Sequence, residues 1–383
     1  MKLLFFQWSA FLQKDIEAVL RHREDIELTC ASYDFKDLDS DPYFASHFAP
    51  ILTAKPYDAV FSVNFFPVLS DLCEVHRIPY ISWVYDAPMN VRRVESFANS
   101  VNRIYVFDRG QYNDLVKAGF TTVSHLPLGC DTRKIDSMTI TDEDRERFSG
   151  DISFIGKLYH TPYNEMMAPL GEPLRSFFEA LVTEQLNTYG EYFLAERLTD
   201  EVLAQANAIY RLVSGNPEYT VAHAEMEFLL ANEVTRRERL AVLDRLSERY
   251  DVALYSFDSC PELPKVHIRG VARYYSDMPK VFALSKVNLN ITLKIIKEGM
   301  PLRVLDILGA GGLLLSNYQK ELDENFADGQ EVLLYRSMDE LLAHTEFCLT
   351  HEKERREIAA RGHARAHELF ELETQLSKLL PVT

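Results

Sequence analysis

Residues 297–317 read KEGMPLRVLDILGAGGLLLSN and join a polar loop, a short helical pattern and an apolar run. Pro301 suits the first turn of a helix, because the N–H group that proline lacks would be unpaired there. The glycine cluster at 309–312 ends that helix. The GLLLSN run that follows has the length and composition of a buried strand. Helix followed by buried strand is the repeating element of a parallel α/β sheet.

The same alternation of short apolar runs and helical patterns fills the first 145 residues. It predicts a helix over about 13–22. The predicted strands are rich in β-branched and aromatic residues and cover Leu3–Trp8, 57–64, 79–86, 103–108 and 122–129. Runs of this kind, separated by helices, predict a parallel sheet. A polar, charged stretch at 131–151 then favours a linker.

A second unit begins with the strand pattern ISFIGKLY at 152–159. Residues from about 162 to 236 have helical patterns without strand-like runs, which indicates a helical insertion. The α/β rhythm then resumes and ends in a charged helical tail at 351–380. The sequence therefore predicts two Rossmann-like α/β domains, over 1–145 and 146–383. Because ligands bind outside the carboxyl ends of parallel strands, two such domains predict a site in an interdomain cleft.

Composition excludes several classes of function. The chain has 383 residues, of which 47% are apolar, and a formal net charge of −17. That charge argues against nucleic acid or an anionic membrane as a partner, since both favour Lys and Arg. Five cysteines, an odd number without a CxxC pair, favour unpaired thiols in a reducing cytosol. No apolar run reaches 18 residues, so we expect a cytoplasmic protein without an integral membrane segment.

Common cofactor and metal motifs are missing from the sequence. No GxGxxG follows the first strand, which disfavours a nicotinamide enzyme, and no GxxxxGK[ST] is present. The histidines show no HExxH spacing. A DSD triplet at 39–41 imitates a metal-binding DxD motif. It lies in an early polar loop, and we therefore predict no metal site.

The loop and helix of the opening stretch carry the chemistry. A helix N-terminus bears partial positive charge and free N–H groups, which suit a diphosphate. Gly299 lets backbone approach a ligand closely. Arg303 can neutralise phosphate, Asp306 one turn later can bind the two hydroxyls of a ribose, and Glu298 can reach a sugar beyond the phosphate. The arrangement suits a nucleotide-sugar, although a loop Glu, a surface Asp and a glycine turn also occur in ordinary αβ units.

A resemblance to a known family adds to this interpretation. The spacing Glu298-x7-Asp306 resembles the E-x7-E element of retaining GT-B glycosyltransferases, with Asp in the second position. Five motifs also follow one another in the order seen in CgeB-like (spore-maturation-protein B-like) glycosyltransferases. These motifs are PYISWVYDAP, VFDRGQYNDLVKAGF, HLPLGCD, ISFIGKLY and VNLNIT…GMPLRVLDILGAGG.

The resemblance implies a GT-B fold and a hexosyltransferase that takes a sugar from a nucleoside diphosphate, with UDP as the expected nucleotide. By this resemblance Lys157 contacts the diphosphate and Gly156 lets its loop approach. Arg303 assists, Glu298 holds the donor sugar and Asp306 the ribose. The shorter Asp alters or water-bridges that ribose contact. The family implies retention of stereochemistry, no metal, and no cofactor, since the nucleotide-sugar is a donor substrate. The N-terminal domain would meet the acceptor, which is a glycan, a protein or a small molecule.

Asp86 is the candidate on the acceptor side. It follows the strand pattern at 79–86, at the end that faces the predicted cleft, where it can orient an acceptor hydroxyl or take its proton. Trp83 or Tyr85 can stack on a sugar ring. Asp108 ends the next strand and is expected to cap the following helix. Two alternatives stay open for the whole protein: a nucleotide-sugar epimerase on the same fold, and a non-catalytic nucleotide-sugar-binding protein.

Overall fold

The computed structural model describes residues 1–381, and its contacts divide them into two compact units. The N-terminal unit contains Met1–Met138, Glu298–Gly309 and the chain from Ala364 onward. The C-terminal unit contains Thr139–Lys297 and Ala310–His363. The helix of the opening stretch thus groups with the N-terminal unit, while the strand after it belongs to the C-terminal unit. The domain bounds 1–145 and 146–383 stay a prediction.

Six parallel strands form the sheet of the N-terminal unit, in the order β2-β1-β3-β4-β5-β6. Its central strands are buried on both faces, as the continuous apolar runs predict. The strands are β1 (Lys2–Gln7), β2 (Glu27–Ser32), β3 (Ala59–Val63), β4 (Tyr80–Val84), β5 (Asn102–Val106) and β6 (Val123–His125).

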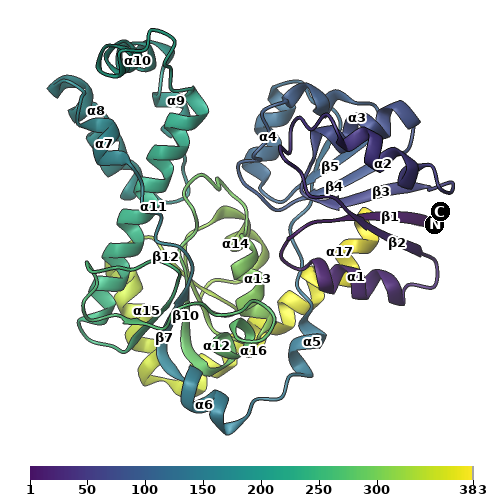
Figure 1. The fold of residues 1–383 in the computed structure, drawn as a ribbon. Helices are drawn as coiled ribbons and strands as arrows, with labels where there is room; N and C mark the ends of the chain where they lie inside the picture. Colours follow the sequence, from purple (N-terminus) through teal and green to yellow (C-terminus); the bar gives the residue numbers. More distant parts are fainter. Residues whose placement is uncertain (382–383) are drawn as a thin grey trace. The chain divides into compact units, whose positions relative to one another are not determined.

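Helices cover both faces of this sheet, with α1 and α17 on one face and α2 and α3 on the other (Figure 1). A dense aromatic core under α2 and α3 includes Phe6, Phe44, Phe48 and Phe66. The helices of the unit are α1 (Gln13–His22), α2 (Phe44–Leu52), α3 (Pro67–His76), the 3₁₀ turn Val94–Ala98, α4 (Arg109–Lys117), α5 (Thr132–Asp136), α13 (Leu302–Gly309) and α17 (Leu372–Leu379).

A second parallel sheet forms the C-terminal unit, in the order β12-β11-β10-β7-β8-β9. The strands are β7 (Gly150–Ile155), β8 (Val252–Tyr255), β9 (His267–Ile268), β10 (Ser285–Asn290), β11 (Leu314–Asn317) and β12 (Leu333–Tyr335). Around them lie α6 (Asp142–Phe148), α12 (Met278–Leu284), α14 (Lys320–Asn325) and α15 (Met338–Thr350), while α16 (Glu352–Phe370) continues into the N-terminal unit.

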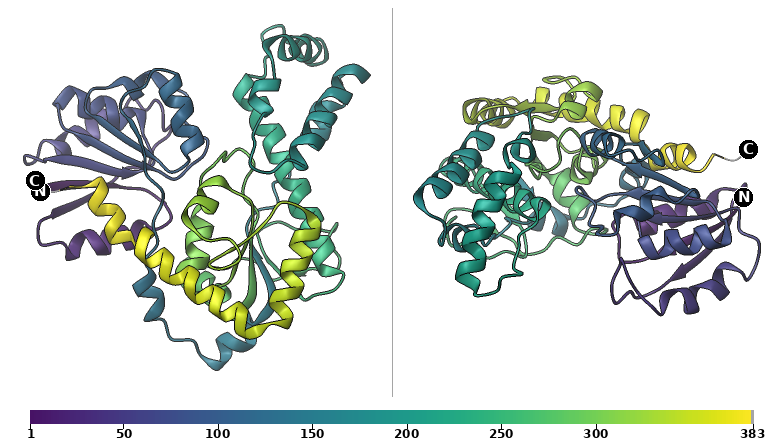
Figure 2. Two further views of the ribbon diagram at one scale, coloured as in Figure 1. Left: turned by 180° about the vertical axis from the view of Figure 1, so that it is seen from behind. Right: turned by 90° about the horizontal axis from the view of Figure 1, so that it is seen from above.

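The predicted helical insertion is confirmed, as α7 (Tyr163–Met167), α8 (Glu172–Leu186), α9 (Leu194–Arg197), α10 (Asp200–Ser214) and the long α11 (His223–Ser247). These helices have a hydrophobic core of their own, which includes Phe178, Met226 and Leu230. α11 enters the sheet region and packs on β8, and α10 lies at the far end of the insertion (Figure 1). Figure 2 shows the same helices, in teal, projecting from the sheet when the molecule is turned round.

Several elements differ from the sequence predictions. The helices α2, α14 and α15 were not predicted. The strands β2 and β12 were not predicted. β2 is only partly buried, so it lacks an apolar run, and β12 has just three residues. The polar stretch at 131–151 is not an extended linker, since it contains α5 and α6. A capping box at Thr141 and Asp144 starts α6 and gives a charged segment its helix.

Two expectations from composition can be compared with the structure. All five cysteines are unpaired thiols, as predicted, and four of them are buried. Within residues 1–381, no helix combines the length and the hydropathy that crossing a bilayer requires.

Candidate functional site

In each sheet the strand order reverses at one point, and this places two candidate crevices. In the N-terminal unit β1 lies between β2 and β3, so the chain leaves β1 in both directions. In the C-terminal unit β7 lies between β8 and β10 in the same way. Ligands of open α/β sheets bind outside the carboxyl ends of the strands at such switch points. The crevices are therefore those after β1 and β3, and after β7 and β10.

Asp86 follows β4, the neighbour of β3 at the N-terminal crevice, and is held by Asn64. Asn64 follows β3 directly and has the left-handed φ of 63°, which Asn tolerates better than most residues. Its amide Nδ2 donates to Asp86 Oδ2 at 2.7 Å, and its Oδ1 accepts from the backbone N–H of Tyr85 at 2.7 Å. A buried Asn at the end of one strand thus orients the carboxylate that follows the next.

The Asp86 carboxyl has a shifted pKa. The side chain reaches solvent, but the many protein atoms around it desolvate the carboxylate and raise its pKa. The hydrogen bond from Asn64 works in the other direction and lowers it. A carboxyl with a raised pKa is better able to accept a proton near neutral pH than an ordinary Asp.

Of the two aromatic residues beside Asp86, one is in the core and the other is partly exposed. Trp83 is fully buried in β4, and its Nε1 donates to the carbonyl of Leu126 at 3.4 Å. The prediction that Trp83 can stack on a sugar is therefore wrong, because the ring belongs to the core. Tyr85 is partly exposed and meets Trp83 edge to face, with ring centroids 5.2 Å apart.

Asp108 caps α4, as predicted, and does more. Its Oδ1 accepts from the backbone N–H of Gly110 at 3.1 Å, and from those of Glu298 and Gly299 at 2.9 Å each. A Cβ on Gly299 would lie 2.7 Å from the Asp108 Cα, so only glycine permits this approach. The close backbone approach predicted at Gly299 is thus made by the backbone of Asp108 in this structure. The buried carboxylate of Asp108 anchors the 298–299 loop.

Glu298 points to a partner that the sequence did not suggest. Its Oε2 accepts from Nε of Arg109 at 2.6 Å, and both side chains are less than a third exposed. Arg303 and Asp306 follow in α13 and are partly buried. Asp306 lies close enough to Cys130 that its charge raises the pKa of that thiol, in addition to the larger effect of burial.

The C-terminal crevice contains Gly156 and Lys157, in the loop directly after β7. The Gly156 N–H donates to the carbonyl of Tyr255 at 3.0 Å, and the Leu158 N–H donates to Asp258 Oδ2 at 2.5 Å. The loop is therefore held at both sides of Lys157 by the end of β8, while the Lys157 side chain is exposed. An exposed cation on a fixed loop at a switch point can bind a phosphate.

The seven residues singled out from the sequence thus divide between the units. The C-terminal unit carries Gly156 and Lys157, and the N-terminal unit carries Asp86, Glu298, Gly299, Arg303 and Asp306. Sequence reasoning missed Asn64, although a polar residue ending a buried strand pattern was a usable signal. It also missed Arg109, for which the sequence offered no signal, since its partner lies 189 positions away.

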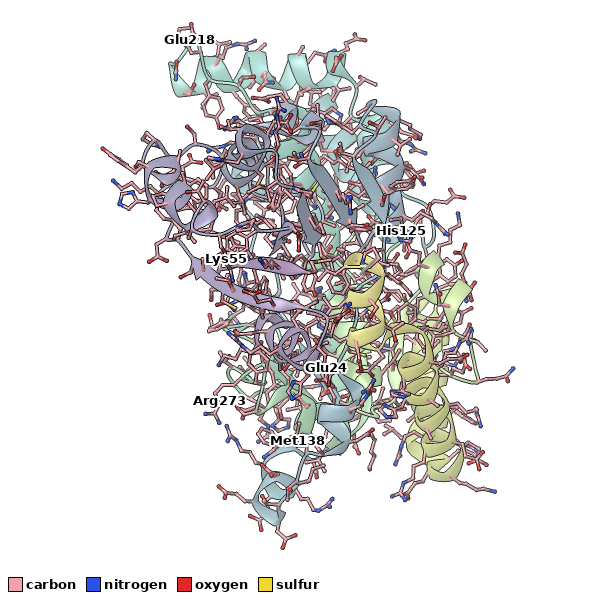
Figure 3. The ribbon with its side chains drawn as sticks, turned by 90° about the vertical axis from the view of Figure 1, so that its right-hand side faces the viewer. Glu24, Lys55, His125, Met138, Glu218 and Arg273 are labelled. Atoms are coloured by element: carbon pink, nitrogen blue, oxygen red, sulfur yellow. The ribbon has the colours of Figure 1, made fainter. Side chains whose placement is uncertain are left out.

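The DSD triplet and His125 have structural partners. Asp39 accepts from the backbone N–H groups of Arg92 and Arg93, and Asp41 accepts from that of Tyr43, so the DSD loop is a set of turns. His125, labelled in Figure 3, donates from Nε2 to the carbonyl of Phe107 at 3.2 Å at the end of the sheet.

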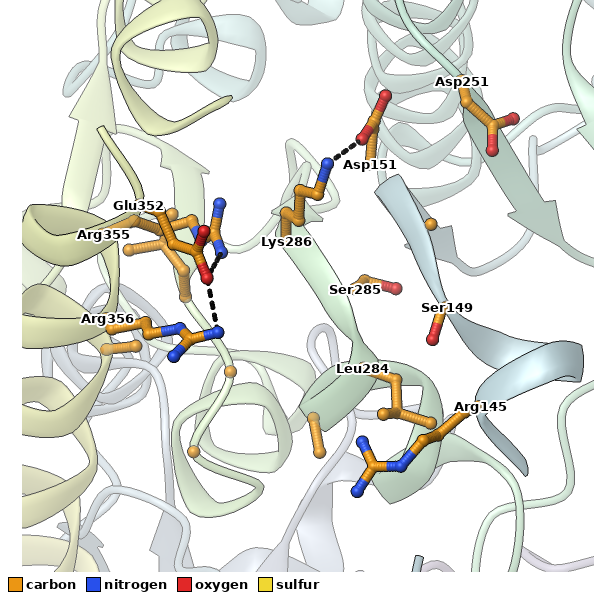
Figure 4. A pocket seen from close by; sticks show the side chains of 16 residues that line it. Arg145, Ser149, Asp151, Asp251, Leu284, Ser285, Lys286, Glu352, Arg355 and Arg356 are labelled. Atoms are coloured by element: carbon orange, nitrogen blue, oxygen red, sulfur yellow. Dashed lines mark hydrogen bonds and ion pairs between the residues drawn. The ribbon is translucent and has the colours of Figure 1, made fainter. Parts of the chain in front are cut away.

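A pocket of about 600 Å³ lies in the C-terminal unit (Figure 4). Its walls include the first residues of β7 and β10, so it opens at the amino ends of the strands, away from the switch-point crevice. Several of its charges are already paired. Lys286 contacts Asp151 at 2.7 Å, and Arg356 contacts Glu352. The pocket is therefore separate from the candidate site.

Solved structures share this architecture over the whole chain. HepE of Anabaena, solved with UDP and glucose, has a TM-score of 0.53 at 12% identity, over 99% of this chain and 98% of that one. A glycosyltransferase of Rickettsia africae gives 0.54 at 10% identity, over 100% and 99%. The T4 phage BGT, solved with UDP-glucose, gives 0.51 at 9% identity, over the full length of both chains.

Sequence comparison is informative for one part of the chain. No curated protein is significantly similar to it. Residues 236–380 match the family model described as glycosyl transferase-like, and this segment contains β8 to β12 and α13. The chain therefore has the GT-B fold, and the C-terminal part of its sequence is similar to glycosyl transferase-like proteins.

Proposed function

We propose that the protein is a glycosyltransferase that moves a sugar from a nucleoside diphosphate, UDP in the first instance, to an acceptor hydroxyl. The observation that carries the proposal is the exposed Lys157 on its fixed loop at the switch point of a GT-B C-terminal sheet. The match of residues 236–380 to a glycosyl transferase-like family, and the UDP or UDP-glucose bound by HepE and BGT, support it.

The proposed chemistry follows the charge that develops during transfer. As the bond between the anomeric carbon and the diphosphate breaks, negative charge grows on the leaving phosphate. Lys157 and Arg303 would stabilise that charge, and the N–H groups at the start of α13 would add to them. Asp86 would orient the acceptor hydroxyl and take its proton, which its raised pKa favours.

The finer proposals follow the CgeB-like resemblance. Glu298 would hold the donor sugar, Asp306 the ribose, and Gly156 would admit the diphosphate to the loop. The sugar transferred would be a hexose, stereochemistry would be retained, and no metal would be needed, since cationic side chains would stabilise the leaving group.

A second candidate is a nucleotide-sugar-binding protein without transferase activity. The observation that favours it is the ion pair between Glu298 and Arg109, which occupies the carboxylate proposed for the sugar. Under the transferase proposal, a sugar hydroxyl shares Glu298 with that arginine.

One experiment separates the candidates. The protein is screened by thermal shift against nucleoside diphosphates and their sugars, and the ligands that bind are then incubated with and without candidate acceptors. A ligand at 100 times its Kd stabilises the fold by about 2.7 kcal/mol. Binding with turnover only in the presence of an acceptor supports the transferase, and binding without turnover supports the binding protein. A changed sugar released without acceptor indicates an epimerase, and no stabilisation by any nucleoside diphosphate contradicts all three.

A further inference from the structure

Arg239, in α11, is the largest charged side chain that the structure buries completely. It is 1% exposed and has no role in the site described so far. One terminal nitrogen, Nη1, donates to the carbonyl of Lys157, and the other, Nη2, donates to the carbonyl of Ile291. The plane of the guanidinium lies over two rings, 5.1 Å from the centroid of Phe154 and 4.8 Å from that of Tyr159.

The two carbonyls lie on the two sides of the switch point. Lys157 is in the loop after β7, and Ile291 directly follows β10, the neighbour of β7 at which the strand order reverses. A single side chain from α11 therefore connects the two loops that border the C-terminal crevice. This is the point of the sheet at which ligands of open α/β folds commonly bind.

α11 also contacts the segment after β10 through a second residue. Thr235, one turn before Arg239, accepts from the backbone N–H of Lys294 through its Oγ1 at 2.9 Å. Lys294 is itself buried and donates from Nζ to the carbonyl of Thr188 in the insertion at 2.8 Å. The segment after β10 is thus attached to the insertion by main chain and side chain alike.

Stability by itself does not require a cation at this position. Burial lowers the pKa of Arg239, which records the unfavourable desolvation of its charge. Its Nε has no hydrogen-bond partner among the described residues, so even its donors are not fully used. Apolar residues of similar volume often replace buried ions without loss of stability. The charge and the two-carbonyl geometry therefore point to a role beyond packing.

We propose that Arg239 is a positioning residue that holds Lys157 and the segment after β10 in the geometry that binds the donor diphosphate. The identity of the ligand rests on the proposed function. The positioning of the two loops by Arg239 does not depend on it. With this role for Arg239, the helical insertion would contribute to the donor site.

The test compares Arg239→Lys and Arg239→Met with Arg237→Gln. Arg237 lies two residues away on α11 and forms ion pairs with Glu179 and Glu233, all within the insertion. Arg237→Gln is a matched control, because the substitution removes a partly buried arginine that contacts neither crevice loop. UDP affinity is measured by calorimetry, and hydrogen exchange is followed at 156–159 and 291–294 without ligand.

We expect UDP binding to weaken tenfold or more in Arg239→Met and less in Arg239→Lys, which keeps the charge but cannot bridge two carbonyls. Exchange at both loops should accelerate in both variants and stay unchanged in Arg237→Gln. Equal losses of UDP affinity in the Arg237 control, or unchanged affinity in Arg239→Met, would overturn the proposal.

Two arms cover the remaining outcomes. If the Arg239 variants do not fold, Thr235→Val serves instead: it removes the bond from Lys294 and, within α11, the bond from the Thr235 hydroxyl to the carbonyl of Ala231. UDP added to the parent protein should protect 156–159 and 291–294 together. Slower hydrogen exchange in only one of the two loops would contradict the proposal that Arg239 positions both. If the parent protein does not bind UDP, the proposed function fails by itself, and unchanged exchange in Arg239→Lys then rejects the positioning role independently.

Discussion

The two switch-point crevices have the same kind of strand reversal, but different side chains position their polar groups. In the N-terminal unit a neutral amide, Asn64, holds one carboxylate, Asp86. In the C-terminal unit a buried cation, Arg239, holds two backbone carbonyls beneath the exposed Lys157. A neutral support leaves the pKa of the carboxyl raised and suits proton transfer, whereas a cationic support suits an anionic ligand. Under our proposal, the first kind of support would serve the acceptor and the second the donor diphosphate.

The largest expected effect concerns the N-terminal crevice. Asp86→Asn keeps the shape and removes the base, so transfer should fall about 10²–10⁴-fold while UDP affinity stays within a factor of two. Initial rates with saturating donor measure the first quantity and calorimetry the second. Loss of UDP binding would show that Asp86 is not confined to the acceptor side, and the contrast between the crevices would fail.

Asp108 tests the anchor between the α4 cap and the 298–299 loop. Asp108→Ala leaves three backbone donors without this acceptor, two of them buried and one partly buried, so the N-terminal unit should lose about 3 kcal/mol in free energy of unfolding. Asp108→Asn is the control, since it keeps one acceptor oxygen and should lose about 1 kcal/mol. Denaturant unfolding followed by tryptophan fluorescence measures both. Equal losses in the two variants would show that the charge, and not the acceptor, is what matters.

Lys157 tests the donor crevice. Lys157→Ala should weaken UDP binding about 10- to 150-fold, because a charge-assisted hydrogen bond contributes about 1.5–3 kcal/mol. Lys286→Ala is the matched control, since Lys286 lies on the same sheet at the amino end of β10 and pairs with Asp151. A comparable loss of UDP affinity in Lys286→Ala would indicate that the nucleotide binds in the pocket at the amino ends of the strands.

The pH profile of transfer sharpens the role of Asn64. Asp86 must be ionised to accept a proton, so activity falls as the pH falls through its pKa. Asn64→Gly keeps the left-handed backbone accessible and removes the hydrogen bond that lowers that pKa. The acid limb of the profile should therefore move to higher pH, with the plateau rate nearly unchanged. A limb that stays in place means that another group titrates.

The smallest expected effect is that of a chelator. If cationic side chains stabilise the leaving diphosphate, transfer in excess EDTA should equal transfer without it. The control is the same assay with added Mg²⁺, which should not raise the rate. Loss of transfer on chelation would mean that a metal does the work assigned to Lys157 and Arg303.

Several elements could be read from the sequence for simple physical reasons. Buried parallel strands such as β3 and β4 are continuous apolar runs, and the helices between them have clear starts and ends. The cap at Asp108 follows from an acidic residue between a strand and a helix. The partly exposed β2 has no such pattern, and Trp83 could not be distinguished from a ligand-facing aromatic, since alternation is lost in a strand buried on both faces.

By itself, the sequence determined the α/β class, the two sheets, the helical insertion and the loops that carry Lys157 and Glu298. These depend on local periodicity and on residues at strand ends, which a chain expresses over short stretches. Only the tertiary structure decided the partners: Asn64 with Asp86, Asp108 with Gly299, Arg109 with Glu298, and Arg239 with two carbonyls. The physical reason is that hydrogen bonds and ion pairs form between residues 22 to 191 positions apart, where sequence spacing carries no information about which groups meet.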